Sequence, residues 1–151
     1  MIQEALLAYL HIAAILSWVV FLTSSAVLAR AEWLNTAALE RLVRVDRIAN
    51  IAGAAVLATG LARSVWGLKG ASWYWQQPLL WAKLALVLAM AGIGIGITRQ
   101  IAQWRRHHLQ DGRLPEPAGV ASVRRRLMWS SHLTVVLPLL GVLLARGIGT
   151  R

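Results

Sequence analysis

The chain has 151 residues, of which 58% are hydrophobic and only 15% are charged, and its mean hydropathy is +0.57. This bias is far from that of an average soluble domain, and the absence of cysteine excludes disulfides and thiolate metal sites. The formal net charge is +10. We do not attribute it to nucleic-acid binding, because the basic residues are distributed as in membrane proteins of fixed orientation.

Four long apolar stretches account for the composition, at residues 5–29, 48–66, 78–98 and 127–145. A span needs about 20 mostly apolar residues to cross roughly 30 Å of hydrocarbon. The first stretch has no basic segment before it, so we expect a span rather than a cleaved signal peptide. Because a backbone in lipid must satisfy its own hydrogen bonds, the spans are expected to be helices. The chain is therefore predicted to be all-α, a single four-span, up-down helix bundle over residues 1–151.

The basic residues outside the spans divide unequally between the two sides of the membrane. The segments 31–47 and 99–126, predicted here as loops, carry ten arginines, whereas Lys69, Arg146 and Arg151 are the only basic residues in the segments on the opposite side. By the positive-inside rule both loops face the cytoplasm and both termini lie outside. We therefore expect a multi-pass protein of a bacterial inner membrane, with its arginines near anionic lipid headgroups.

Small residues indicate where the helices approach one another. Gly53 and Gly60 lie seven residues apart on the second span, and Gly92 and Gly96 form a G-x-x-x-G on the third. Small side chains permit close backbone approach and van der Waals packing in lipid. We expect these glycines to mark helix contacts, and the aromatic residues 73–75 to lie at the membrane–water interface.

A histidine and two basic side chains lie in the outer part of the apolar stretches, namely His11, Arg63 and Lys83. Such groups are costly at membrane depth and are functional-site candidates by default. At a rise of about 1.5 Å per residue, all three fall roughly 7–9 Å above the midplane, on the outer side. A neutral His11 beside two cations leaves room for an anion. Haem offers an iron for the imidazole and propionates for the cations; alternatively, the cations extend to the headgroups and His11 is structural.

Two further side chains share helix faces with these candidates. Trp18 follows His11 by seven residues and is expected on the same face, as a wall of the site. Met90 follows Lys83 by seven residues and offers either a thioether to a haem iron or ordinary core packing.

His132 on the fourth span is placed on the inner side, roughly 16 Å from His11 along the membrane normal. Two imidazoles on one iron need nitrogens only about 4 Å apart, so His132 is the less favoured iron ligand. We expect it to hydrogen-bond one of the first-span hydroxyls, Thr23, Ser24 or Ser25.

The segment 10–18, with sequence LHIAAILSW, resembles the start of the bacterial HemJ family, a membrane protoporphyrinogen oxidase whose opening places a histidine and a tryptophan seven residues apart. The resemblance continues at residues 40–44, 59–61 and 81–88, and implies a four-helix haem b protein. In it His11 matches the essential histidine and Lys83 the essential lysine. Copper-resistance D-type domains are also similar, and small uncharacterised four-span membrane proteins are most similar. Residues 128–133 differ from the oxidase ending.

Together these observations predict a haem b-binding membrane oxidoreductase that transfers electrons, with a porphyrin as substrate in the oxidase version and quinone as redox partner. The alternative is a cofactor-free accessory or structural subunit of a larger membrane complex, or of a homo-oligomer. A copper-handling protein is disfavoured because His11 and the methionines Met1, Met90 and Met128 are few and scattered. No nucleic-acid partner is expected.

Overall fold

The computed structural model describes residues 2–147, so Met1 and Arg151 lie outside the described part of the chain. The elements are α1 (Ile2–Leu28), the 3₁₀ helix η1 (Ala31–Trp33), α2 (Thr36–Trp66), α3 (Ala71–Trp75), α4 (Pro78–Asp111), α5 (Pro117–Leu133) and α6 (Val136–Ala145). Four helical stretches, namely α1, α2, α4 and α5 with α6, are long and apolar enough to cross a membrane. The predicted all-α, four-span architecture is confirmed.

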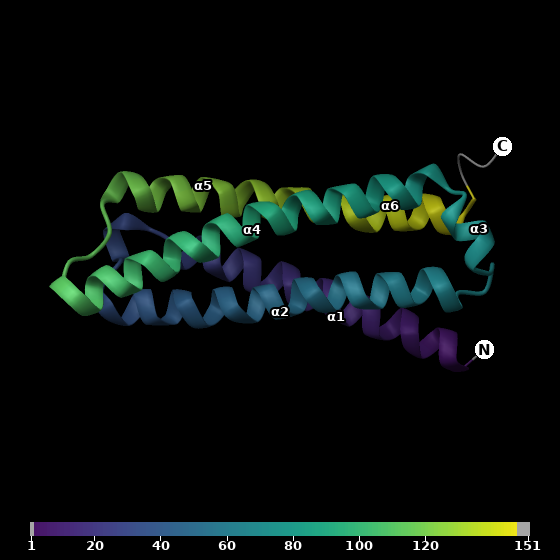
Figure 1. The fold of residues 1–151 in the computed structure, drawn as a ribbon, viewed down its shortest axis with the longest axis horizontal. Coiled ribbons are helices and arrows are strands. Elements are labelled where there is room, and N and C mark those ends of the chain that lie inside the picture. Colours follow the sequence, from purple (N-terminus) through teal and green to yellow (C-terminus); the bar gives the residue numbers. More distant parts are fainter. Residues whose placement is uncertain (1, 148–151) are drawn as a thin grey trace.

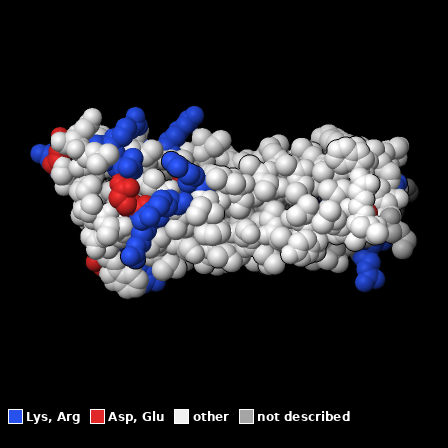
Figure 2. Space-filling view, turned by 90° about the horizontal axis from the view of Figure 1, so that it is seen from below, with Lys and Arg blue, Asp and Glu red and all other residues white. Residues whose placement is uncertain are grey.

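The spans run alternately up and down along one long bundle (Figure 1). Helix α1 packs against α2 and α5, and α4 packs against α2, α5 and α6. The two chain termini and α3 lie at one end, called the termini end below. The connections α1–α2 and α4–α5 lie at the other end, where most of the visible Lys and Arg side chains gather (Figure 2). This second end is called the arginine-rich end, and the positive-inside rule predicts that it faces the cytoplasm.

The segments predicted as loops at residues 31–47 and 99–126 are mostly helical, which corrects the predicted boundaries. Helix α2 begins at Thr36, where the Asn35 side chain accepts a hydrogen bond from the Ala38 N–H at 2.9 Å. Helix α4 continues to Asp111 and ends at Gly112 with φ +67°, a conformation that favours glycine. Only residues 112–116 separate it from α5.

These helical extensions have their own hydrophobic core at the arginine-rich end. Its buried members come mainly from four helices, and the most fully buried ones, from α2, α4 and α5, recur at helical spacing: Leu39, Leu42, Ile97, Ile101, Val120, Val123 and Leu127. Arginines occupy the other faces of the same helices. A hydropathy window averages the two faces and so misses an amphipathic helix that continues past the membrane.

The fourth span is interrupted between α5 and α6, at Thr134 and Val135. Pro138 lies four residues after Thr134, has no N–H, and its ring clashes with the carbonyl of the residue four positions earlier. The Thr134 hydroxyl donates to the Ser131 carbonyl at 2.5 Å, which satisfies this side chain at the break. The regular hydrogen-bond pattern of the span is therefore interrupted just before α6, which lines the termini end.

Two of the glycines that were expected to mark helix contacts do so between α1 and α2. A Cβ added at Gly53 would lie 3.1 Å from Trp18 Nε1, and one at Gly60 would lie 3.2 Å from His11 Cε1. A Cβ at Gly92, in contrast, would meet no heavy atom within 4 Å. The predicted contact at Gly92 is therefore wrong within this chain, because that side of α4 faces outward.

Gly53→Val should destabilise the protein by about 1–3 kcal/mol, because extra methyl groups in a packed contact force the Trp18 indole or the backbone to shift. Thermal unfolding in detergent measures the loss. Gly92→Val is the matched control, since it adds the same side chain to the third span where the surroundings are open. Equal losses for the two variants would contradict the α1–α2 packing described here.

The absence of cysteine permits a direct test of orientation with single cysteines at two exposed positions. Ser72→Cys at the termini end should react with an impermeant maleimide in intact cells. Arg113→Cys at the arginine-rich end should react only after the cells are opened. The reverse pattern would overturn the predicted orientation.

Candidate ligand site at the termini end

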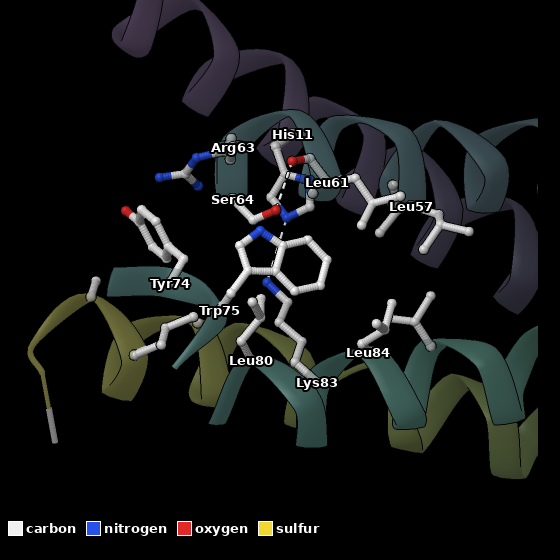
Figure 3. A pocket seen from close by; sticks show the side chains of 16 residues that line it. His11, Leu57, Leu61, Arg63, Ser64, Tyr74, Trp75, Leu80, Lys83 and Leu84 are labelled. Atoms are coloured by element: carbon white, nitrogen blue, oxygen red, sulfur yellow. Dashed lines mark hydrogen bonds between the residues drawn. The ribbon is translucent and has the colours of Figure 1, made fainter. Parts of the chain in front are cut away.

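A cavity of about 110 Å³ lies inside the termini end of the bundle. It is bounded by α1, α2, α4 and α6, and the short helix α3 contributes Tyr74 and Trp75 to its wall (Figure 3). Half of the lining residues are aliphatic, namely Val56, Leu57, Leu61, Leu80, Leu84, Val87, Leu144 and Ala145. The ionisable lining residues include His11, Arg63 and Lys83. The structure thus brings together the three residues that the sequence placed at similar height.

His11 is the only residue of α1 that lines the cavity, and it is only 4% exposed. Its Nδ1 lies 2.8 Å from Thr59 Oγ1, and the Thr59 hydroxyl donates to the Ala55 carbonyl at 2.6 Å. A hydroxyl has one hydrogen to donate, so Thr59 accepts from Nδ1–H. The hydrogen-bond network therefore assigns the proton of a neutral imidazole to Nδ1 and leaves a lone pair on Nε2.

Lys83 directs its ammonium group at that lone pair. Its Nζ lies 3.5 Å from His11 Nε2, the contact drawn as a dashed line in Figure 3. On the other side Gly141 of α6 lies beside the ammonium group, and a Cβ added there would be in ordinary contact with Nζ at 3.5 Å. No carboxylate pairs with Lys83 among residues 2–147. An ammonium group has three donors, so Lys83 retains capacity for an anionic or polar ligand.

Arg63 lies in the last turn of α2, and its Nη2 is 3.9 Å from Glu4 Oε1. The two side chains are 34% and 24% exposed, and a partly solvated pair of this length is weak. One carboxylate therefore faces two cations, which leaves an excess positive charge around the cavity. The predicted alternative, extension toward the headgroups, describes Arg63 better than Lys83, whose ammonium group points inward.

Trp18 and Met90 lie close to the cavity but do not line it. Both are buried in one packed cluster with Val56, Val87 and Leu137. The seven-residue spacings did place them on the expected helix faces, yet seven residues correspond to about 10.5 Å of rise. They therefore occupy the packed core on the side of the cavity toward the arginine-rich end, and packing is the role that their positions support.

His132 is exposed on α5 and does not line the cavity with His11. Its Nδ1 lies 2.6 Å from the Met128 carbonyl of its own helix. The hydroxyls of Ser24 and Ser25 likewise donate to carbonyls four residues earlier on α1. The expected bond from His132 to these hydroxyls is therefore wrong, because each polar side chain is satisfied within its own helix.

Thr59, Tyr74, Trp75 and Gly141 complete the site but were not identified from the sequence. Thr59 is four residues before Arg63 and so lies on the same face of α2, which is a signal that could have identified it. For Gly141 the sequence offers none, because its role depends on where α6 lies after the break in the fourth span.

A second polar cluster, around the buried Asp46, joins α2 and α4 nearer the arginine-rich end. Thr98 donates to Asp46 Oδ2 at 2.8 Å, and Asn50 donates to Thr98 Oγ1 at 2.9 Å and to Asp46 Oδ2 at 3.2 Å. These bonds satisfy the carboxylate without the neighbouring arginines. The cluster is a structural link between two spans.

Comparison with known proteins gives a family and nothing more specific. A family model described as "Predicted membrane protein (DUF2214)" matches residues 3–149, so the chain belongs to this family. No curated protein and no solved structure matches.

Thr59→Val should release the His11 ring from its fixed tautomer, because valine has nearly the same shape but cannot accept from Nδ1–H. ¹⁵N NMR of labelled histidine measures the change, with the His11 signals identified by their absence from His11→Gln. Wild-type His11 should show a protonated Nδ1 and a bare Nε2, and Thr59→Ser should preserve this pattern. A wild-type ring protonated on Nε2 would contradict the assignment.

Proposed function

We propose that this membrane protein binds haem b in the cavity at the termini end and serves in electron transfer at a bacterial inner membrane. The observation that carries the proposal is the lone pair of His11 Nε2. It faces an apolar cavity in which Lys83 has no carboxylate partner among the described residues. A neutral imidazole with its other ring nitrogen bonded to a neighbouring oxygen is the usual state of a histidine that binds a metal.

The residues present fit a haem in their chemistry. His11 would supply a nitrogen ligand for the iron, Lys83 and Arg63 would hold the propionates, and the leucines of α2 and α4 would contact the macrocycle. When bound, haem supplies a one-electron redox centre whose potential depends on its axial ligand, hydrogen bonding and burial. The Thr59 hydroxyl fixes the orientation of the imidazole, and Gly60 allows the ring to lie against α2.

The open volume of the cavity is smaller than a porphyrin requires. Typical pockets for small molecules and cofactors have volumes of about 300–1,000 Å³, against about 110 Å³ here. Binding therefore requires the cavity to widen. The element suited to move is α3, because it has only five residues, supplies Tyr74 and Trp75, and follows Gly70, whose φ is +78°.

The resemblance to the HemJ family supports the enzymatic form of this proposal. His11 and Lys83, which match that family's essential histidine and lysine, are the two residues in direct contact in the cavity. In this form the substrate is a porphyrinogen and the electron acceptor is a quinone. The resemblance alone supports that choice of substrate and acceptor.

The volume of the cavity favours a second candidate function, that of a cofactor-free accessory subunit in a larger membrane complex. In that case Lys83 itself is the partner of His11 Nε2, and the pair links α1 to α4. The two functions differ in one direct observable, the presence of a haem spectrum.

Protein purified in detergent from cells supplied with haem should show the absorption bands of haem b, and His11→Ala should lose most of the bound haem because the axial nitrogen is removed. His132→Ala and Met90→Leu should retain it, since neither residue lines the cavity. Optical spectra with a pyridine haemochrome assay measure the content. Colourless wild-type protein that is correctly folded would overturn the proposal and support the accessory subunit.

A further inference from the structure

The outward face of α5 carries a groove of about 430 Å³, distinct from the cavity at the termini end. It is called the α5 groove below. All its lining residues belong to α5, at spacings that place them on one side of the helix: Ala121, Arg124, Arg125, Met128, Trp129 and His132. No part of the proposed haem site contributes to it.

The part of the α5 groove nearest the arginine-rich end is cationic, and it lacks negatively charged partners. Arg124 Nε is buried without a hydrogen-bond partner. The ion pairs of the described chain are Arg63–Glu4 and Arg105–Glu40, so neither Arg124 nor Arg125 is neutralised within residues 2–147. A guanidinium group favours carboxylate or phosphate oxygens, to which it can donate two parallel bonds. The groove therefore offers two guanidinium groups to an anion of this kind.

The part of the α5 groove further from the arginine-rich end is apolar. Trp129 follows Arg125 by four residues, which moves it about 6 Å along the helix toward the apolar part of the span. It is 67% exposed, and Met128 beside it is also exposed. An exposed tryptophan one helical turn further into the apolar span than a pair of arginines is typical of the membrane–water interface. From the arginine-rich end toward the apolar span, the groove therefore presents cations and then an apolar surface. A phospholipid presents its phosphate and then its acyl chains in the same direction.

We propose that the α5 groove binds one anionic phospholipid, with its phosphodiester on Arg124 and Arg125 and an acyl chain along Met128 and Trp129. The location favours a lipid over a protein partner. The groove lies where the arginine-bearing part of α5 meets the apolar span, and at that depth the anionic lipids of the cytoplasmic leaflet are the abundant phosphates. Lipid bound there covers a helix face that no other element of the described chain covers.

Native mass spectrometry of the full chain, reconstituted with phosphatidylglycerol or phosphatidylcholine, tests the proposal. Wild-type protein should retain one phosphatidylglycerol in preference to phosphatidylcholine. Arg124→Gln/Arg125→Gln should weaken that retention roughly 30-fold, from about fivefold per basic residue near the surface. Arg41→Gln/Arg44→Gln is the matched control, because it removes the same charge from exposed positions on α2 and should retain the lipid.

Trp129→Ala separates a lipid from free phosphate as the ligand. It leaves the charge unchanged, and should weaken retention of phosphatidylglycerol while competition by inorganic phosphate stays the same.

Equal losses in the two double variants would overturn the proposal, because the lipid would then follow general surface charge. Protein that retains no phosphatidylglycerol would also overturn it, as would a dimer that Arg124→Gln/Arg125→Gln converts to monomer, since a second copy would then occupy the groove. Circular dichroism and thermal unfolding identify variants that have lost the fold.

Discussion

Lipid offers no hydrogen bonds, and this constraint determines how most polar side chains in the spans are placed, although the buried Ser130 hydroxyl has no partner among the described residues. An unsatisfied polar group in hydrocarbon costs several kcal/mol, so hydroxyls donate to carbonyls three or four residues earlier on their own helix. Those that do so are Ser24, Ser25, Thr59, Ser64, Ser131 and Thr134. Asp46 is satisfied between two helices instead, through Thr98 and Asn50. Lys83 departs from this pattern, because its contact with His11 Nε2 is long, at 3.5 Å, and leaves capacity for a ligand.

The contact between α1 and α2 sets the geometry around Lys83. His11 lies against Gly60, and Trp18 lies against Gly53. The two residues on α1 are seven apart, as are the two glycines on α2, and their order along the chain is reversed, as antiparallel helices require. The register that packs Trp18 into the core therefore also brings the imidazole beside Thr59. A single packing interface thus fixes both the stability of the bundle and the tautomer of the candidate ligand.

Much of this arrangement follows from the sequence, because span length and rise per residue determine the height of a side chain in the membrane. Height alone brought His11, Arg63 and Lys83 to one level. The rotation of each helix about its axis is not determined in this way, so the Thr59 partner was missed. Trp18 and Met90 were expected nearer the site than they lie. The helical extensions at the arginine-rich end were missed for another reason, because arginines on one face conceal the buried face that Leu39 and Leu42 share.

The cations at the two ends of the bundle have different physical consequences. At the arginine-rich end they gather at the surface (Figure 2), where the positive-inside rule predicts that they orient the chain. At the termini end Lys83 is turned inward among leucines, where the burial of its charge carries a desolvation penalty. The arginines at the other end suffice for the predicted orientation, so orientation does not explain the presence of Lys83. Its inward position is therefore explained by what it contacts, either the lone pair of His11 or a ligand that takes the place of that contact.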